Sequence, residues 1–245
     1  NRYGLIGANG AGKSTFLKIL AGEIEANSGE IVIENGLKVG VLGQDQFAFE
    51  NFSVKDAVLY GNKRLFEAVK EKEQLYMSEE FTDAVNDRLA QLEMISAEED
   101  PSYEYEVRIE KILSSLGFSD FEKPMSEVEN SDKFKVLLAQ VLFPKPDILF
   151  LDEPTNNLDI DSIKWLENEL NRHEGTMVLI SHDRHFLNEV CTHMADLDYN
   201  TITVYPGNYD DYMLASAQSR ERALKDNAKA KEKLQELQEF VARFS

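Results

Sequence analysis

A glycine-rich turn places the strictest limit on what this chain can fold into. Residues 7–15 read GANGAGKST; they follow a short apolar run, Tyr3 to Ile6, and precede an apolar stretch with helical spacing. A strand, this turn and a helix form the pattern G-x-x-x-x-G-K-[ST] in its required order. Glycine lets backbone N–H groups point inward, and the N-terminus of the following helix attracts anions. The segment therefore predicts a phosphate-binding loop at the end of a buried strand.

The polar residues of the turn suit a nucleoside triphosphate with a divalent cation. Lys13 can reach the β- and γ-phosphates, and the Ser14 hydroxyl can ligate Mg²⁺. The predicted nucleotide contacts are Gly7, Ala8, Asn9, Gly10, Ala11, Gly12, Lys13, Ser14 and Thr15. The alternative is a glycine-rich turn that binds nothing, which the flanking strand and helix disfavour.

A second apolar run ends in two acids. Ile148 to Leu151 is followed by Asp152 and Glu153 in the stretch DILFLDEPTNNLDI. A continuous apolar run of this length is typical of a strand buried in a parallel sheet, and ligands bind at the carboxyl ends of such strands. Asp152 is therefore predicted to hold Mg²⁺ beside the phosphate loop, through water. Glu153 is predicted to orient or deprotonate an attacking water.

A third run ends in a histidine. Met177 to Ile180 precedes Ser181 and His182, and His182 at a strand end is predicted to contact the γ-phosphate. His185, one helical turn further on, is interpreted as a surface or packing residue. A fourth strand-like run, from Val39 to Leu42, is followed by Gln44. On its own, a glutamine after a strand does not indicate a function.

Together these pieces resemble the ATP-binding cassette (ABC) ATPases. GANGAGKST resembles the Walker A motif, and ILFLDE the Walker B motif with its catalytic glutamate. NNLD, ending at Asp159, resembles the D-loop; Gln44 matches the Q-loop and His182 the switch histidine. The resemblance covers about residues 1–210. It implies an α/β fold: a P-loop NTPase core of the ABC type with a parallel sheet and a helical signature subdomain. It also implies ATP and Mg²⁺ as ligands, with Gln44 both on the metal and among the catalytic residues with Glu153 and His182, and with Asp159 at the nucleotide.

The sequence resembles most closely the ABC-F family within these ATPases, in its YbiT-like branch. LDEPTNNLDI, ISHDRHFLNEVCTHMADLD and VYPGNYDDYM carry this likeness. The resemblance implies a cytoplasmic tandem-cassette translation factor with a second cassette in the same chain. It also implies contact with the ribosome and tRNA through an arm and a linker, and no insertion into a membrane. The sequence starts on a strand without Met and stops inside a helical pattern. We therefore expect a fragment without the first strand of the cassette and its adenine-stacking aromatic residue.

The expected organisation has three parts. Residues 1–61 and 144–212 form the ATP-binding core, residues 62–143 form the helical subdomain, and residues 213–245 start the interdomain linker. Within residues 62–113 we predict an inserted helical hairpin, the arm, with an apolar face of Phe81, Val85, Leu89 and Leu92. This stretch carries a net charge of −7, which argues against broad contact with rRNA. An ordinary subdomain helix with an acidic solvated face is the alternative.

Residues 215–245 are the one stretch with more bases than acids. Apolar positions recur there with mostly three-and-four spacing, which predicts a helix with one largely apolar face. The face comprises Leu224, Ala228, Lys231, Leu234, Leu237, Val241 and Phe244. A helix that caps the domain, rather than a linker, remains the alternative for its early part.

The segment VENSD, residues 128–132, takes the place of the family signature LSGGQ and departs from it at nearly every position. Asn130 and Ser131 stand for the two glycines, and either is predicted to cap the following helix. Glu129 stands for the serine, and its carboxylate would face a triphosphate held by the second cassette. We therefore expect a complete nucleotide site on Lys13 and Glu153 and a weakened one opposite it. Drift at a tolerant position is the alternative.

Composition narrows the function classes. The 245 residues carry a formal net charge of −19, which disfavours nucleic-acid binding by bulk charge. Cys191 is the single cysteine, so no intramolecular disulfide can form. No signal peptide or apolar run of about 18 residues is present, which predicts a cytosolic protein. Two alternatives remain: the ATPase subunit of a membrane transporter, which shares every catalytic motif, and a nucleotide-sensing scaffold, which the intact Glu153 and His182 disfavour.

Overall fold

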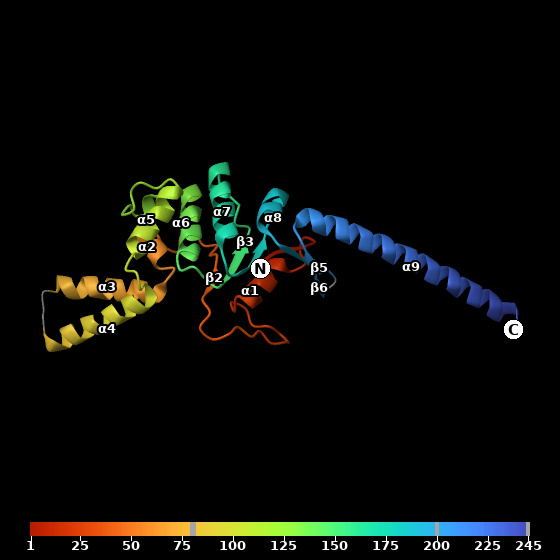
Figure 1. Cartoon of the computed structure of the whole chain (residues 1–245), viewed down its shortest axis with the longest axis horizontal. Coiled ribbons are helices and arrows are strands. Elements are labelled where there is room, and N and C mark those ends of the chain that lie inside the picture. Colours follow the sequence, from red (N-terminus) through yellow and green to blue (C-terminus); the bar gives the residue numbers. More distant parts are fainter. Residues whose placement is uncertain (79–81, 199–200, 244–245) are drawn as a thin grey trace.

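A six-stranded sheet forms the centre of the computed structural model, which describes residues 1–78, 82–198 and 201–243 (Figure 1). Its strand order is β2-β3-β4-β1-β5-β6; β1 to β5 run parallel, and β6 pairs antiparallel with β5. The strands are β1 (Arg2–Gly7), β2 (Val39–Val41), β3 (Ile148–Asp152), β4 (Thr176–Ile180), β5 (His193–Asp198) and β6 (Thr201–Pro206). The predicted apolar runs are therefore strands, and the α/β class with a parallel core is confirmed.

Helices cover both faces of this sheet. Helix α1 (Lys13–Leu20) packs on one face, where Leu17 joins Leu5, Phe150 and Ile180 in a buried cluster. Helices α6 (Asn130–Leu142), α7 (Ile160–Arg172) and α8 (Arg184–Val190) pack on the other face. Because strands buried on both faces need apolar side chains on both sides, β3 and β4 read as continuous apolar runs.

A second apolar cluster lies beside the sheet. It joins α2 (Val54–Leu59), α5 (Tyr105–Ser115) and the rear of α6, together with the short 3-10 turn Met125–Glu127. Trp165 of α7 packs against both this cluster and the sheet cluster. The helical part of the molecule is therefore fixed to the core through α6 and α7.

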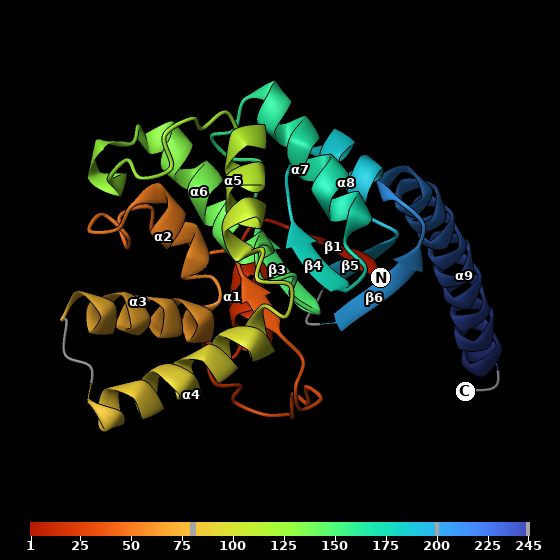
Figure 2. The same cartoon turned by 60° about the vertical axis from the view of Figure 1, so that its left-hand side comes forward.

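The predicted arm is an antiparallel pair of helices that projects from the body (Figure 2). It comprises α3 (Lys63–Met77) and α4 (Asp83–Glu99) and is shorter than the predicted range 62–113, because α5 packs with α2 and α6. On the expected face of α4, Leu92 is 1% exposed, and Val85 and Leu89 are half-buried. Phe81 lies outside the described residues.

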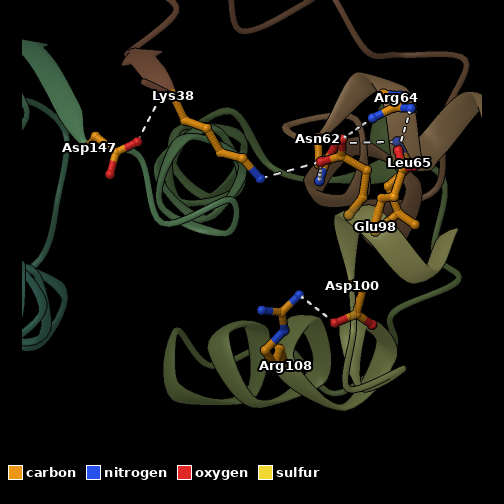
Figure 3. A network of polar contacts seen from close by, with 9 residues as sticks. Lys38, Asn62, Arg64, Leu65, Glu98, Asp100, Arg108 and Asp147 are labelled. Carbon is orange, nitrogen blue, oxygen red and sulfur yellow. Dashed lines mark hydrogen bonds and ion pairs between the residues drawn. The ribbon is translucent and has the colours of Figure 1, made fainter. Parts of the chain in front are cut away.

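The base of the arm is held by one carboxylate. Glu99, at the end of α4, accepts hydrogen bonds from Lys38 Nζ (3.3 Å), Asn62 Nδ2 (3.1 Å) and Arg64 Nη1 (3.0 Å). Figure 3 labels the three donors at the base of the arm. Asn62 also caps α3, and Lys38 immediately precedes β2. Glu99 therefore ties both ends of the arm to each other and to the edge of the sheet.

The C-terminal segment is one long helix, α9 (Tyr209–Arg243), which extends away from the body (Figure 1). Its first turns pack on the core: Tyr212 and Ser216 are each 7% exposed, and the Tyr212 hydroxyl donates to Asp196 Oδ2 at 2.8 Å. Further on, Leu224 is 70% exposed and Leu234 57%. The early part thus caps the domain, and further along the helix Leu224 and Leu234 are exposed. Phe244 lies outside the described residues, as do the side chains of Leu237 and Val241.

The predicted cap of α6 is wrong. Asn130 is the first residue of the helix, Glu129 precedes it in an extended conformation, and no side chain caps the terminus. The register is set by Val128, which is 6% exposed and anchored in the second apolar cluster. Because Val128 must point inward, Asn130 and Ser131 fall inside the first turn, where their side chains are exposed.

Candidate functional site

Three neighbouring strands deliver the predicted site residues to one edge of the sheet. In the order β3-β4-β1, Asp152 ends β3 and Glu153 follows it, His182 comes shortly after β4, and the glycine-rich loop follows β1. Parallel strands end at the same edge, so the loops after them converge. The structure therefore brings together residues that are up to 175 positions apart in the chain (182 − 7).

The glycine-rich loop forms an open cradle. Gly10 and Gly12 have φ angles of 81° and 92°, a backbone conformation that is strained for any residue with a Cβ. A Cβ added at either position would meet no atom within 4 Å. Helix α1 starts directly after Gly12 with no side-chain cap, so its first N–H groups face the loop. The geometry suits the phosphate chain of a nucleotide, which needs close approach to the backbone.

Lys13 lies across this cradle. Its Nζ donates to the carbonyl oxygens of Gly7 at 2.9 Å and Ala8 at 3.1 Å. These are exchangeable backbone partners, and an ammonium group gains more from a phosphate oxygen than from a neutral carbonyl. The side chain is thus already poised over the position where the β- and γ-phosphates are expected.

Gln44 and Asp152 lie side by side, although 108 positions separate them. Gln44 Nε2 donates to Asp152 Oδ2 at 3.2 Å, because β2 and β3 are neighbours in the sheet. Asp152 Oδ1 and the amide oxygen of Gln44 supply oxygen ligands of the kind that Mg²⁺ prefers. With the Ser14 hydroxyl at the start of α1, these residues fit the donor set expected for the metal.

Glu153 has one oxygen with a donor and one without. Its Oε2 accepts from the backbone N–H of His182 at 3.3 Å, while Oε1 is buried and has no hydrogen bond among the described residues. The ring Nε2 of His182 lies 3.4 Å from Oε1. Burial raises the pKa of Glu153 above its usual value, although the His182 N–H opposes this. A buried carboxylate with a free acceptor and a raised pKa can take a proton from water.

The backbone at Glu153 is also unusual. Its φ angle is 51°, rare for a residue with a side chain, and its N–H donates to the Ile180 carbonyl at 2.9 Å. Strain of this kind costs about 1–3 kcal/mol and is concentrated at functional sites. The bond to β4 and this turn together aim the carboxylate toward His182.

Asp159 caps the next helix and is paired with a lysine. Its Oδ1 accepts from the Ser162 N–H at 2.8 Å at the start of α7, and its Oδ2 lies 2.8 Å from Lys135 Nζ. The hydrogen bond with Lys135, followed by that with Ser162, holds the pKa of Asp159 far below its usual value. Asp159 is therefore a fixed anion near the start of α7, and the D-loop ends in a rigid turn.

Two residues near the site were not found from the sequence. Lys133 and Lys135, in the first turns of α6, contact the loops that follow Gln44 and Glu153. No local pattern indicates them, because their partners are distant in the chain. His185, interpreted as a surface residue, is exposed and lies 3.5 Å from Glu167 through its Nδ1.

Comparison with known proteins agrees with this geometry. The sequence profile of the ABC transporter family matches residues 1–156, and a second profile with the same description matches residues 195–245. "Probable ATP-binding protein YbiT" of Escherichia coli O157:H7 is 54% identical over 247 residues, which cover 100% of this chain and 46% of that protein. The chain is an ABC-F cassette of the YbiT-like branch.

Other similarities extend the comparison. "Energy-dependent translational throttle protein EttA" of Mycobacterium tuberculosis is 31% identical to this cassette, over 96% of the chain and 42% of that protein. A solved structure described as "Structure of ATP binding subunit of ABC transporter" superposes with a TM-score of 0.60 at 20% identity, over 86% of this chain and 79% of that one. The latter likeness shows the fold alone.

The cassette spans about half the length of the curated relatives it matches. In the described parts of the chain, no helix is long and apolar enough to cross a bilayer.

Proposed function

We propose that this cassette binds ATP with Mg²⁺ and hydrolyses it to ADP and phosphate when a second cassette of the same protein closes on it. The observation that carries the proposal is Oε1 of Glu153, which is buried at the edge of the sheet, has no hydrogen bond among the described residues, and lies 3.4 Å from His182 Nε2. A carboxylate in that place can accept the proton of a water that attacks the γ-phosphate.

Each residue of the edge has a proposed role. Backbone N–H groups of residues 8–15 hold the phosphates, and Lys13 exchanges its carbonyl partners for phosphate oxygens. Ser14, Gln44 and Asp152 hold Mg²⁺, Asp152 through water; the metal, when bound, offsets the charge that develops on the phosphates. In this proposal His182 contacts the γ-phosphate, and Asp159 contacts nucleotide at the cassette interface.

The second cassette is needed to complete the site. On this proposal the isolated chain binds ATP weakly and turns it over slowly, because the signature that faces Lys13 comes from the second cassette. The opposite site, closed by Glu129 and Asn130 of this chain, is the weaker of the two. Equal nucleotide affinities at both sites of the full-length protein, measured with a fluorescent ATP analogue, would contradict this asymmetry.

For the whole protein we propose a cytoplasmic, ribosome-associated translation factor. Support comes from the relative named as a translational throttle and from two projecting elements, the arm and α9. We propose that both contact the ribosome and tRNA, the acidic arm over a small area and α9 from residue 215 on, where bases exceed acids. The proposed division is an ATP-binding core (residues 1–61 and 144–212), a helical subdomain (62–143) and a linker from residue 213. ATP binding would bring the cassettes together, and hydrolysis through Glu153 would release them.

The test is ribosome co-sedimentation of the full-length protein with Glu153→Gln, with and without ATP. Because the substitution removes the proposed base and leaves the phosphate loop intact, ATP should be bound and not cleaved. ATP-dependent pelleting with ribosomes is the expected result. Absence of pelleting at low salt, together with recovery in a membrane fraction, would instead favour the ATPase subunit of a transporter.

A further inference from the structure

Helix α6 begins with two lysines that reach in different directions. Lys133 and Lys135 are two positions apart, so their side chains leave the helix roughly 200° apart around its axis. The Lys133 residue is 3% exposed, and the Lys135 side chain is 13% exposed. Because lysine is rarely buried without a partner, each ammonium group needs an anion of its own.

Lys133 holds the loop that follows Gln44. Its Nζ donates to Glu50 Oε1 at 2.8 Å and lies 4.8 Å from the centre of the Phe47 ring. At its start, the same loop is fixed by the contact between Gln44 and Asp152. The loop is therefore tied at one end to the proposed metal ligand and at the other to α6.

Lys135 holds the loop that follows Glu153. Its Nζ lies 2.8 Å from Asp159 Oδ2 and 3.0 Å from Asp132 Oδ1. Burial alone would lower the pKa of Lys135, but the hydrogen bonds with Asp159 and Asp132 outweigh it and raise the pKa, so the ammonium group stays charged. Asp159 in turn caps α7, so the turn from Glu153 to Asp159 is fixed at its far end.

We infer that Lys133 and Lys135 are positioning residues for the ATP site of their own cassette. This inference rests on the proposed function. Lys133 holds the loop after Gln44 in position, and Lys135 holds Asp159 in position. Because Asp159 ends the turn that begins at Glu153, Lys135 also positions Glu153 indirectly. The exposed side of the same terminus carries Glu129, whose carboxylate does not suit a phosphate, whereas Asp132 is paired with Lys135. The segment at the signature position thus serves the site on Lys13 more than the site opposite it.

The experiment uses the full-length protein with the phosphate-loop lysine of its second cassette replaced, so that only the site described here turns over ATP. Lys135→Met should lower kcat about 10- to 100-fold through misplacement of the reacting groups, with the KM for ATP unchanged. Lys135→Arg, which keeps the charge and the bonds to Asp159, should recover most of the rate. Lys133→Met should instead raise the Mg²⁺ concentration needed for half-maximal turnover several-fold, because Gln44 is displaced.

Lys72→Met is the matched control. The Lys72 side chain is 18% exposed and pairs with Glu93 at 3.0 Å in the arm, away from the site. It should leave kcat and the Mg²⁺ requirement unchanged. If Lys133→Met does not fold, Glu50→Gln breaks the same ion pair from the exposed loop.

Two results would overturn the inference. The first is a kcat for Lys135→Met equal to that of Lys72→Met. The second is a loss of kcat only at the opposite site, which is measured in protein with Lys13 replaced and the phosphate-loop lysine of the second cassette intact. If the parent with intact lysines hydrolyses no ATP, the proposed function fails separately. The Mg²⁺ dependence of binding of a fluorescent ATP analogue then decides the inference, because the Lys133→Met shift does not require turnover.

Discussion

Helices α1 and α6 begin alike and differ in what they can bind. Neither has a side-chain cap: Gly12 precedes α1, and Glu129 precedes α6. Both termini therefore offer backbone N–H groups and a partial positive charge. The first is entered through glycines with positive φ and has Lys13 as its first residue. The second is entered through an extended residue with a carboxylate, and a second carboxylate, Asp132, lies in its first turn.

The difference shows that a helix terminus is not by itself a phosphate site. The helix dipole contributes about 0.3–1 kcal/mol to an anion at an exposed terminus. A single carboxylate about 4 Å from a phosphate opposes this by about 1 kcal/mol even at the dielectric of water. One acid can therefore cancel the attraction of the helix, and Lys13 and the glycines decide the outcome at α1.

The largest expected effect is on turnover at the α1 site. Glu153→Gln should lower kcat about 10²- to 10⁴-fold, because it removes the proposed base, while ATP affinity stays close to that of the parent. Phosphate release measures this in full-length protein with the phosphate-loop lysine of its second cassette replaced, so that only this site turns over ATP. The parent should lose activity on acidification at a pH above the ordinary carboxyl pKa of 4.5, because the pKa of Glu153 is raised and the protonated carboxyl cannot act as a base. The residual activity of Glu153→Gln should not show this loss, because the titrating carboxyl is absent. Unchanged phosphate release would revive the sensing-scaffold alternative.

Lys13→Met should have the next largest effect and should act on binding. Loss of a charge-assisted hydrogen bond to phosphate costs about 1.5–3 kcal/mol, which corresponds to about 10- to 100-fold weaker binding of ATP. Titration with a fluorescent ATP analogue checks this. Lys18→Met, at the last turn of α1, is the control and should bind ATP normally. If both variants bind alike, Lys13 does not separate α1 from α6.

Gly12→Ala tests the backbone of the cradle alone. A Cβ at residue 12 has no neighbour within 4 Å, so any cost comes from the φ angle of 92°. Holding an L-residue in that region costs about 1–2 kcal/mol, and ATP affinity should fall about tenfold. Ser131→Ala, in the first turn of α6, is the matched change and should leave affinity at this site unchanged. A Gly12→Ala protein that binds ATP normally would show that the glycine conformation is not required.

Glu129→Gln should have the smallest effect. Removing one exposed carboxylate from the terminus of α6 should improve nucleotide affinity at the opposite site by a few-fold, about 0.5–1 kcal/mol, and should do so less at high salt. The measurement is analogue binding to full-length protein in which Lys13 is replaced, so that only the opposite site reports. A gain as large as the loss in Lys13→Met would mean that α6 is a phosphate site blocked by one residue.

The comparison of these termini also shows what the sequence could predict. The glycine-rich loop and the strands before Asp152 and His182 depend on local patterns of a few residues, and they are predicted with small errors at the ends. The range predicted for the arm wrongly takes in α5, because the packing of α5 on α2 and α6 leaves no local signal. The cap of α6 was predicted wrongly, because burial of Val128 rather than the cap preference of Asn130 sets the register. The contacts of Lys133 with Glu50 and of Lys38 with Glu99 join residues 83 and 61 positions apart. No periodicity encodes such pairs, because only the packed tertiary structure brings them together.

The length of α9 has a mechanical consequence. Its 35 residues extend about 52 Å at about 1.5 Å per residue, and its first turns, around Tyr212, are anchored on the core. A tilt of about 10° at that anchor carries the far end through about 9 Å, which is close to the diameter of a helix. The anchored end of α9 contacts α8 and the strands β5 and β6 at the edge of the sheet, and α8 begins two residues after His182. Any tilt at this anchor therefore produces its largest displacement at the far end of α9.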